Sequence, residues 1–183
     1  MRTCRGTSNP VLELPHNRFS RWVDRLVIHI GEYVSWVWLL LLGIIVLNVL
    51  MRYLLSEGRI EFEEIQWHLY SLGFLLGLSY SYTRDAHVRV DVIRERLSPQ
   101  TQAWIELYGT LFLLLPFIML VVVASVPFIA YSFATSEVSQ APGGLPFRWL
   151  IKSVLLIGFL VLLLSVISRL SRVLYFLFAR GSS

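Results

Sequence analysis

Long uncharged stretches dominate the chain, and short polar segments separate them. Residues 33–51, 65–83, 107–136 and 153–168 contain no Asp, Glu, Lys or Arg. A membrane-spanning helix needs roughly 20 mostly apolar residues. The pattern therefore predicts an all-α integral membrane protein with four transmembrane helices, at about 31–52, 63–83, 103–128 and 149–172. Residues 1–30 are expected to form an N-terminal segment, and 31–180 the membrane domain.

The polar segments carry signals for where helices begin and end. Three glutamates within 61–64 crowd the start of the second span, where a helix N-terminus favours negative charge. Ser98 followed by Pro99 is typical of an N-cap and a first helical position, so the third helix is expected to begin before its membrane part. Pro116 or Pro127 is expected to kink that helix, and Pro127 is an alternative end for it.

Basic residues are unevenly divided between the two sides that this arrangement defines. Twelve of the 16 Lys and Arg residues lie in the N-terminal segment, in the connection 84–102 or in the C-terminal tail. Cytoplasmic loops of membrane proteins carry an excess of Lys and Arg. We therefore expect both termini and the connection 84–102 in the cytoplasm. The net charge of +4 follows from these loops and does not require a nucleic-acid partner.

A polar stripe lies on one face of the second span. Glu61, Glu64, His68 and Ser71 follow helical spacing there. Ionisable side chains inside a membrane can form a proton or ion relay. The stripe stops after about two turns, which favours an interfacial cap in which Glu64 and His68 pair at i, i+4.

Two further polar residues lie at the outer end of the first span. Asn48 and Arg52 are one turn apart there. Two interpretations of Arg52 stay open: it contacts Glu64 as the partner of a buried charge, or it extends its charged end to lipid headgroups.

Small residues recur every four positions along another face of the second span, at Gly73, Gly77 and Ser81. Small residues at this spacing let a second helix approach closely. This small-residue face is expected to pack against another helix, either within this chain or in a larger partner.

Histidines are the remaining candidates for cofactor chemistry. Haem b needs axial ligands that face one another at one depth. His29 and His68 lie near opposite membrane surfaces, and His87 lies in the connection, so this arrangement is disfavoured. We find no Walker A, nucleophile-elbow or HExxH motif and expect neither catalysis nor a cofactor. A haem b anchor subunit of a redox complex is the alternative function.

Several stretches in a fixed order resemble one family. They are NVLMRYLL at 48–55 and EFEEIQWHLYSLGFLLGLSYSYTRDAHVRVDVIRERLSP at 61–99. With the four-span plan they resemble the small membrane (Q) subunit of a tripartite ATP-independent periplasmic (TRAP) transporter. The resemblance covers about 45–180. Its most specific residues are Arg52-Tyr53, Glu64, Leu76-Gly77 and His87-Val88-Arg89-Val90-Asp91.

This resemblance implies a role in the bacterial inner membrane. Such transporters combine a periplasmic binding protein, a large membrane subunit that binds substrate and sodium, and a small subunit. The small subunit would brace the large one during ion-gradient-driven uptake. WHLYSLGFLLG and GGLPFRW resemble the subgroup associated with 2-oxo acids and related compounds, which implies organic acids as substrates.

The segment after the second span alternates polar and apolar residues from His87 to Val92. The alternation favours an extended piece at the inner membrane surface, with a short helix capped by Asp91 as the other reading. Arg89 and Asp91 are expected to pair with each other or with the large subunit. The alternative is a solvated, positively charged connector in which an exposed pair contributes little.

Overall fold

The structure is a computed structural model that describes residues 15, 17–54, 58–85, 97–141 and 143–179. Within these residues every regular element is helical, which confirms the all-α class. α1 spans Arg18–Leu54, α2 spans Ile60–Thr83 and α6 spans Arg148–Ala179. Among the described residues between α2 and α6, the helical residues form one continuous run. It consists of α4 (Pro99–Gly109), the π-helical turn η1 (Thr110–Leu114) and α5 (Leu115–Ala134).

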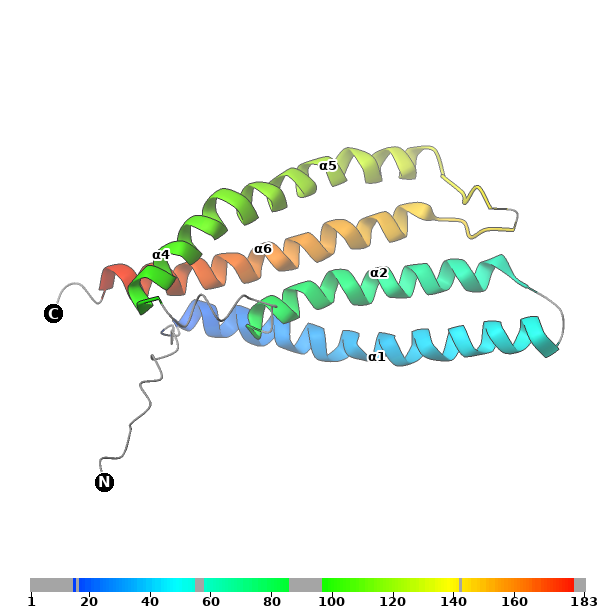
Figure 1. The fold of residues 1–183 in the computed structure, drawn as a ribbon. Coiled ribbons are helices and arrows are strands. Elements are labelled where there is room, and N and C mark those ends of the chain that lie inside the picture. Colours follow the sequence, from blue (N-terminus) through cyan, green and yellow to red (C-terminus); the bar gives the residue numbers. More distant parts are fainter. Residues whose placement is uncertain (1–14, 16, 55–57, 86–96, 142, 180–183) are drawn as a thin grey trace, which may run out of the picture.

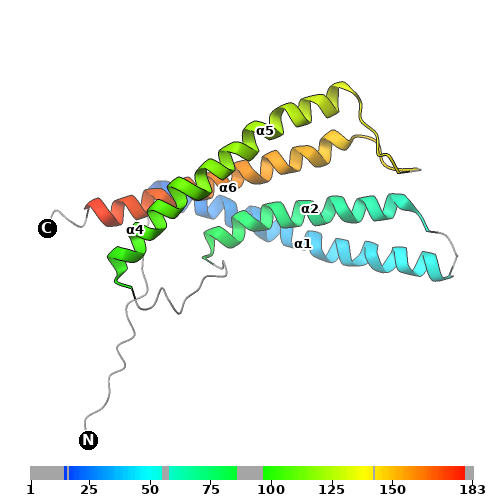
Figure 2. The same cartoon turned by 45° about the horizontal axis from the view of Figure 1, so that its top comes forward.

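The helices lie side by side in the order α1, α2, α6 and α5, as both Figure 1 and Figure 2 show. At one end, here called the terminal end, lie the start of α1, the end of α2, α4 and the end of α6. At the opposite end, the loop end, lie the end of α1, the start of α2, the end of α5 and the start of α6. α1 also contacts α6.

Three of the described helices are long and apolar enough to cross a membrane: α1, the run Pro99–Ala134, and Arg148–Phe178 of α6. α2 has 24 residues but is not among them, so length and composition support three of the four predicted transmembrane helices and not the one predicted at 63–83. Glutamates in its first turns and several serines and tyrosines further along make it less apolar. α2, like α6, has a neighbouring helix on both sides, so less of its surface is left to face lipid.

Much of the apolar surface stays uncovered by the chain itself. Only 6% of the most apolar stretch of α1 is buried, against 28% of that of α6. α6 is the central helix: its Val166 packs with Ile118 of α5, and its Val173 packs with Ala103 of α4. The exposed apolar faces of the other helices suit lipid or another membrane subunit.

The helix signals around the third span are partly confirmed. Ser98 caps α4, because its Oγ accepts a hydrogen bond from the Thr101 N–H at 3.3 Å, and Pro99 lies in the first turn. Pro127 lies inside α5, which continues to Ala134, so its interpretation as the helix end is wrong. The irregular turn η1 lies just before Pro116, a residue that cannot donate a backbone hydrogen bond to that turn.

Two glycines mark where the helices approach most closely. A Cβ on Gly31 of α1 would overlap the Tyr80 ring of α2, and one on Gly158 of α6 would lie 2.8 Å from Leu75 Cβ. Buried Ser79 donates a hydrogen bond to the Gly158 carbonyl at 3.4 Å. α2 therefore contacts α1 and α6 at positions where only the absence of a side chain permits the approach.

Candidate functional site

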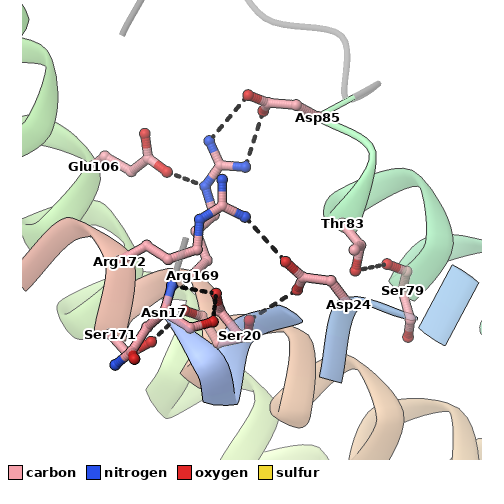
Figure 3. Close-up of polar contacts among 11 residues, drawn as sticks. Asn17, Ser20, Asp24, Ser79, Thr83, Asp85, Glu106, Arg169, Ser171 and Arg172 are labelled. Atoms are coloured by element: carbon pink, nitrogen blue, oxygen red, sulfur yellow. Dashed lines mark hydrogen bonds and ion pairs between the residues drawn. The ribbon is translucent and has the colours of Figure 1, made fainter. Parts of the chain in front are cut away.

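Two arginines of α6 gather three acidic side chains from other parts of the chain at the terminal end (Figure 3). The arginine cluster is Asp24 of α1, Asp85 just after α2, Glu106 of α4, and Arg169 and Arg172 of α6. The cluster thus connects four helices that are far apart in the sequence.

Arg169 is the most enclosed member, with 7% of its side chain exposed. Its Nη1 and Nη2 lie 3.0 and 3.2 Å from the two carboxylate oxygens of Asp85, and its Nε donates to Glu106. The guanidinium also lies over the Tyr82 ring, 5.5 Å from its centroid. Two parallel N–H···O bonds are the strong form of an arginine–carboxylate contact.

Arg172 makes the equivalent connection to α1. Its Nη1 lies 3.2 Å from Asp24 Oδ2, and Ser168 Oγ donates to Asp24 Oδ1 at 2.8 Å.

Asp85 adopts a positive φ of 58°, which is uncommon for a residue with a side chain but several-fold enriched in aspartate. The cluster is therefore a set of paired charges that joins the helix ends.

Sequence reasoning missed this cluster. It assigned Arg169 and Arg172 to membrane orientation alone. The available signal was their i, i+3 spacing next to Ser168, which places both arginines on one face of an apolar helix. Arginines in such a position need acidic or polar partners. The identity of those partners depends on the tertiary fold.

A second polar cluster lies at the loop end, where Glu64 of α2 binds the connection 135–147 between α5 and α6. Ser139 Oγ and the Leu145 N–H both donate to its carboxylate, the latter at 2.5 Å. A Cβ on Gly144 would lie 2.9 Å from Glu64 Oε1, so the close approach requires glycine there. Gly143 adopts a φ of 81°, which suits glycine as well.

An ion pair joins the start of the same connection to α6. Lys152 Nζ of α6 lies 2.5 Å from Glu137 Oε2, and the Arg148 N–H donates to the Glu137 carbonyl at 3.3 Å. The hydrogen bond from the Lys152 ammonium holds the pKa of Glu137 below its usual range. At neutral pH Glu137 is therefore charged and anchors the connection to α6.

The family model for tripartite ATP-independent periplasmic transporters, DctQ component, matches residues 41–175, most of the chain. The chain belongs to this family. It is a small membrane subunit of a TRAP transporter, as the resemblance implied. No curated protein and no solved structure matches it significantly. The stretch matched to the DctQ family contains the polar cluster around Glu64 at the loop end and four members of the arginine cluster. Asp24 precedes it.

The predicted polar residues of this DctQ-family subunit take different partners from those expected. His68 Nδ1 lies 2.5 Å from the backbone carbonyl oxygen of Glu64, whereas the Glu64 carboxylate binds the connection. Arg52 is exposed and does not contact Glu64. Asn48 lies in a groove between α1 and α2, together with Gln66.

The small-residue face of the DctQ-family subunit is only partly covered by its own helices. A Cβ on Gly73 would lie 3.1 Å from the Trp38 ring of α1, but one on Gly77 would meet no atom of another described element within 4 Å. Ser81 is half-buried. The remaining predicted residues, His87, Arg89 and Asp91, lie outside the described residues.

Proposed function

We propose that this chain braces the large membrane subunit of a TRAP-type secondary transporter, as its non-catalytic small permease subunit. The transporter would take up organic acids, such as 2-oxo acids, delivered by a periplasmic binding protein and driven by an ion gradient. The observation that supports this proposal is the position of the ionisable side chains, which gather at the two ends of the helices.

The middle of the bundle is free of charge in all four helices. Residues 33–51, 69–83, 107–134 and 153–168 contain no Asp, Glu, Lys, Arg or His. A path for an ion or an organic acid needs polar groups along the depth of the membrane. Clusters that join helices at both ends, around a middle without charged residues or histidine, support a rigid frame and not a conduit.

The uncovered surface supports a large membrane partner. Most of the apolar stretch of α1 is exposed, and the position of Gly77 leaves room for a helix, since none of the described helices fills it. His87, Arg89 and Asp91 are proposed to meet the same partner from the cytoplasmic side.

The proposed topology has α1, α2, the α4–α5 run and α6 all crossing the inner membrane, with both termini in the cytoplasm. α2 would cross as an inner helix, shielded by α1 and α6. The excess of arginine in the segments at the terminal end supports this orientation.

Reconstitution into liposomes tests the proposal. The chain is purified together with its large subunit, and uptake of radiolabelled 2-oxo acids is measured with the binding protein under an inward sodium gradient. We expect uptake only when both membrane subunits are present, and none from this chain alone. Uptake by either subunit without the other would overturn the bracing role.

Nothing in the described residues favours the haem b alternative. His29 lies toward the terminal end of α1, where its Nδ1 is 2.8 Å from the Arg25 carbonyl oxygen. His68 lies near the loop end of α2. The two imidazoles are therefore far too separated to be axial ligands of one haem.

A further inference from the structure

A cavity of about 440 Å³ opens at the loop end, between the start of α2 and the start of α6. Its apolar wall includes Ile60, Trp67 and Ile151. Its polar wall includes Glu63 and His68 of α2 and Arg148 of α6. Trp67 is largely exposed, and Trp side chains concentrate at membrane–water interfaces, so the cavity is placed at headgroup depth.

Two opposite charges line this cavity: Glu63, and Arg148, whose positive charge also acts on the nearby carboxylates of Glu64 and Glu137. The side chains of Arg148 and Glu63 form no hydrogen bond or ion pair with any residue that the structure describes. The carboxylates near Arg148 are already engaged, Glu64 by the connection and Glu137 by Lys152. The five N–H donors of Arg148 are therefore available to an external anion.

His68 adds an acceptor to the same wall. Its Nδ1 is 2.5 Å from the Glu64 carbonyl oxygen, so Nδ1 carries the proton of the neutral ring. Nε2 of the neutral ring then accepts a hydrogen bond. Glu63 and His68 together can receive the N–H groups of a primary ammonium.

We propose that this cavity binds the headgroup of phosphatidylethanolamine. Arg148 binds the phosphate, Glu63 and His68 bind the ammonium, and the apolar wall contacts the glycerol and the first carbons of the acyl chains. Phosphatidylglycerol would place no cation near Glu63, and the trimethylammonium of phosphatidylcholine has no N–H to donate. This site requires only that the loop ends of α2 and α6 lie at a membrane surface, so it is independent of the transport role.

Native mass spectrometry of the delipidated full-length chain tests the proposal. Phosphatidylethanolamine, phosphatidylcholine and phosphatidylglycerol with the same acyl chains are titrated separately. We expect the Kd for phosphatidylethanolamine to be at least about tenfold lower than for the other two, consistent with one charge-assisted hydrogen bond. Arg148→Gln should raise that Kd about tenfold, equivalent to ~1.4 kcal/mol.

Glu63→Gln should abolish the preference for phosphatidylethanolamine over phosphatidylglycerol, because it removes the charge that selects the ammonium. Arg52→Gln and Glu61→Gln make the same charge changes at the same end without altering the cavity wall. These two control variants should bind all three lipids as the unmodified chain does.

Three results would overturn the proposal. They are equal binding of the three lipids, an unchanged Kd in Arg148→Gln, and competition by inorganic phosphate alone, which would indicate a free-anion site. If Arg148→Gln loses its helical circular dichroism, Glu63→Gln decides the matter, since Glu63 is exposed and its replacement leaves the packing intact. A retained preference in Glu63→Gln would then refute headgroup recognition.

Discussion

Neutralising Glu106 tests whether the arginine cluster holds the helices together. Only 14% of the Glu106 side chain and 7% of the Arg169 side chain are exposed. Glu106→Gln leaves Arg169 with Asp85 alone, and Asp85 is 48% exposed. Removing one partner of a buried ion pair costs about 3–5 kcal/mol. Because Asp85 remains, we expect the lower end of that range, about 3 kcal/mol.

Glu32→Gln is the matched control at the same end. Its ion pair with Arg84 is 3.7 Å long, and both side chains are about half exposed. Exposed pairs contribute about 0–1 kcal/mol. For a chain of this size each kcal/mol shifts the melting temperature by roughly 2–4 °C. Thermal unfolding in detergent, followed by tryptophan fluorescence, should therefore show a Tm about 6–12 °C lower for Glu106→Gln and no more than about 4 °C lower for Glu32→Gln.

A double variant separates the pair energy from a packing effect. Glu106→Leu combined with Arg169→Met replaces both buried charges by apolar groups of similar size. Such replacements are often neutral or stabilising, so the double variant should be more stable than Glu106→Gln. Equal Tm losses for Glu106→Gln and Glu32→Gln, or a double variant less stable than Glu106→Gln, would refute the reasoning.

Three further predictions concern the rest of the chain. Gly158→Ala should lower the stability of the isolated chain by about 1–3 kcal/mol because its methyl group overlaps α2, whereas Gly77→Leu should leave its Tm unchanged and reduce co-purification with the large subunit. Glu137→Gln should lower Tm at pH 7, and the difference from the unmodified chain should disappear as the pH falls through the lowered pKa of Glu137, since the charged form that binds Lys152 is then lost in both. Cys4 should react with a membrane-impermeant thiol reagent only after lysis, and labelling in cells with a permeabilised outer membrane alone would reverse the proposed orientation.

The helices themselves follow from the apolar runs, but their ends do not. α1 begins at Arg18, well before the predicted span start at residue 31. An amphipathic segment, with polar and apolar residues on different sides, continues the helix beyond the apolar stretch. α5 continues past Pro127 because a proline removes only one backbone hydrogen bond from a helix that neighbours help to hold. Hydropathy indicates which residues can lie in contact with lipid. The helix ends depend instead on capping and on contacts outside the membrane.

Contacts between distant residues could not be predicted from spacing. Glu64 was identified as a structural polar residue, yet its partners Ser139 and Leu145 lie in a connection whose path depends on glycines at 143 and 144. The close helix approaches occur at Gly31 and Gly158, isolated glycines with no repeat to mark them. A small-residue repeat indicates that a face can be approached, but it does not identify the helix that approaches.

The arginines of α6 have a structural role that the positive-inside rule cannot detect. The rule counts Lys and Arg residues near the ends of spans, and acidic neighbours contribute little to it. Arg169 and Arg172 therefore contribute to the predicted orientation whether or not Asp24, Asp85 and Glu106 pair with them. Pairing adds a second consequence, because it joins α1, α2 and α4 to α6 at the end where the rule places the cytoplasm. The same two charges can thus orient the subunit and fix its helices, and only the fold distinguishes these two roles.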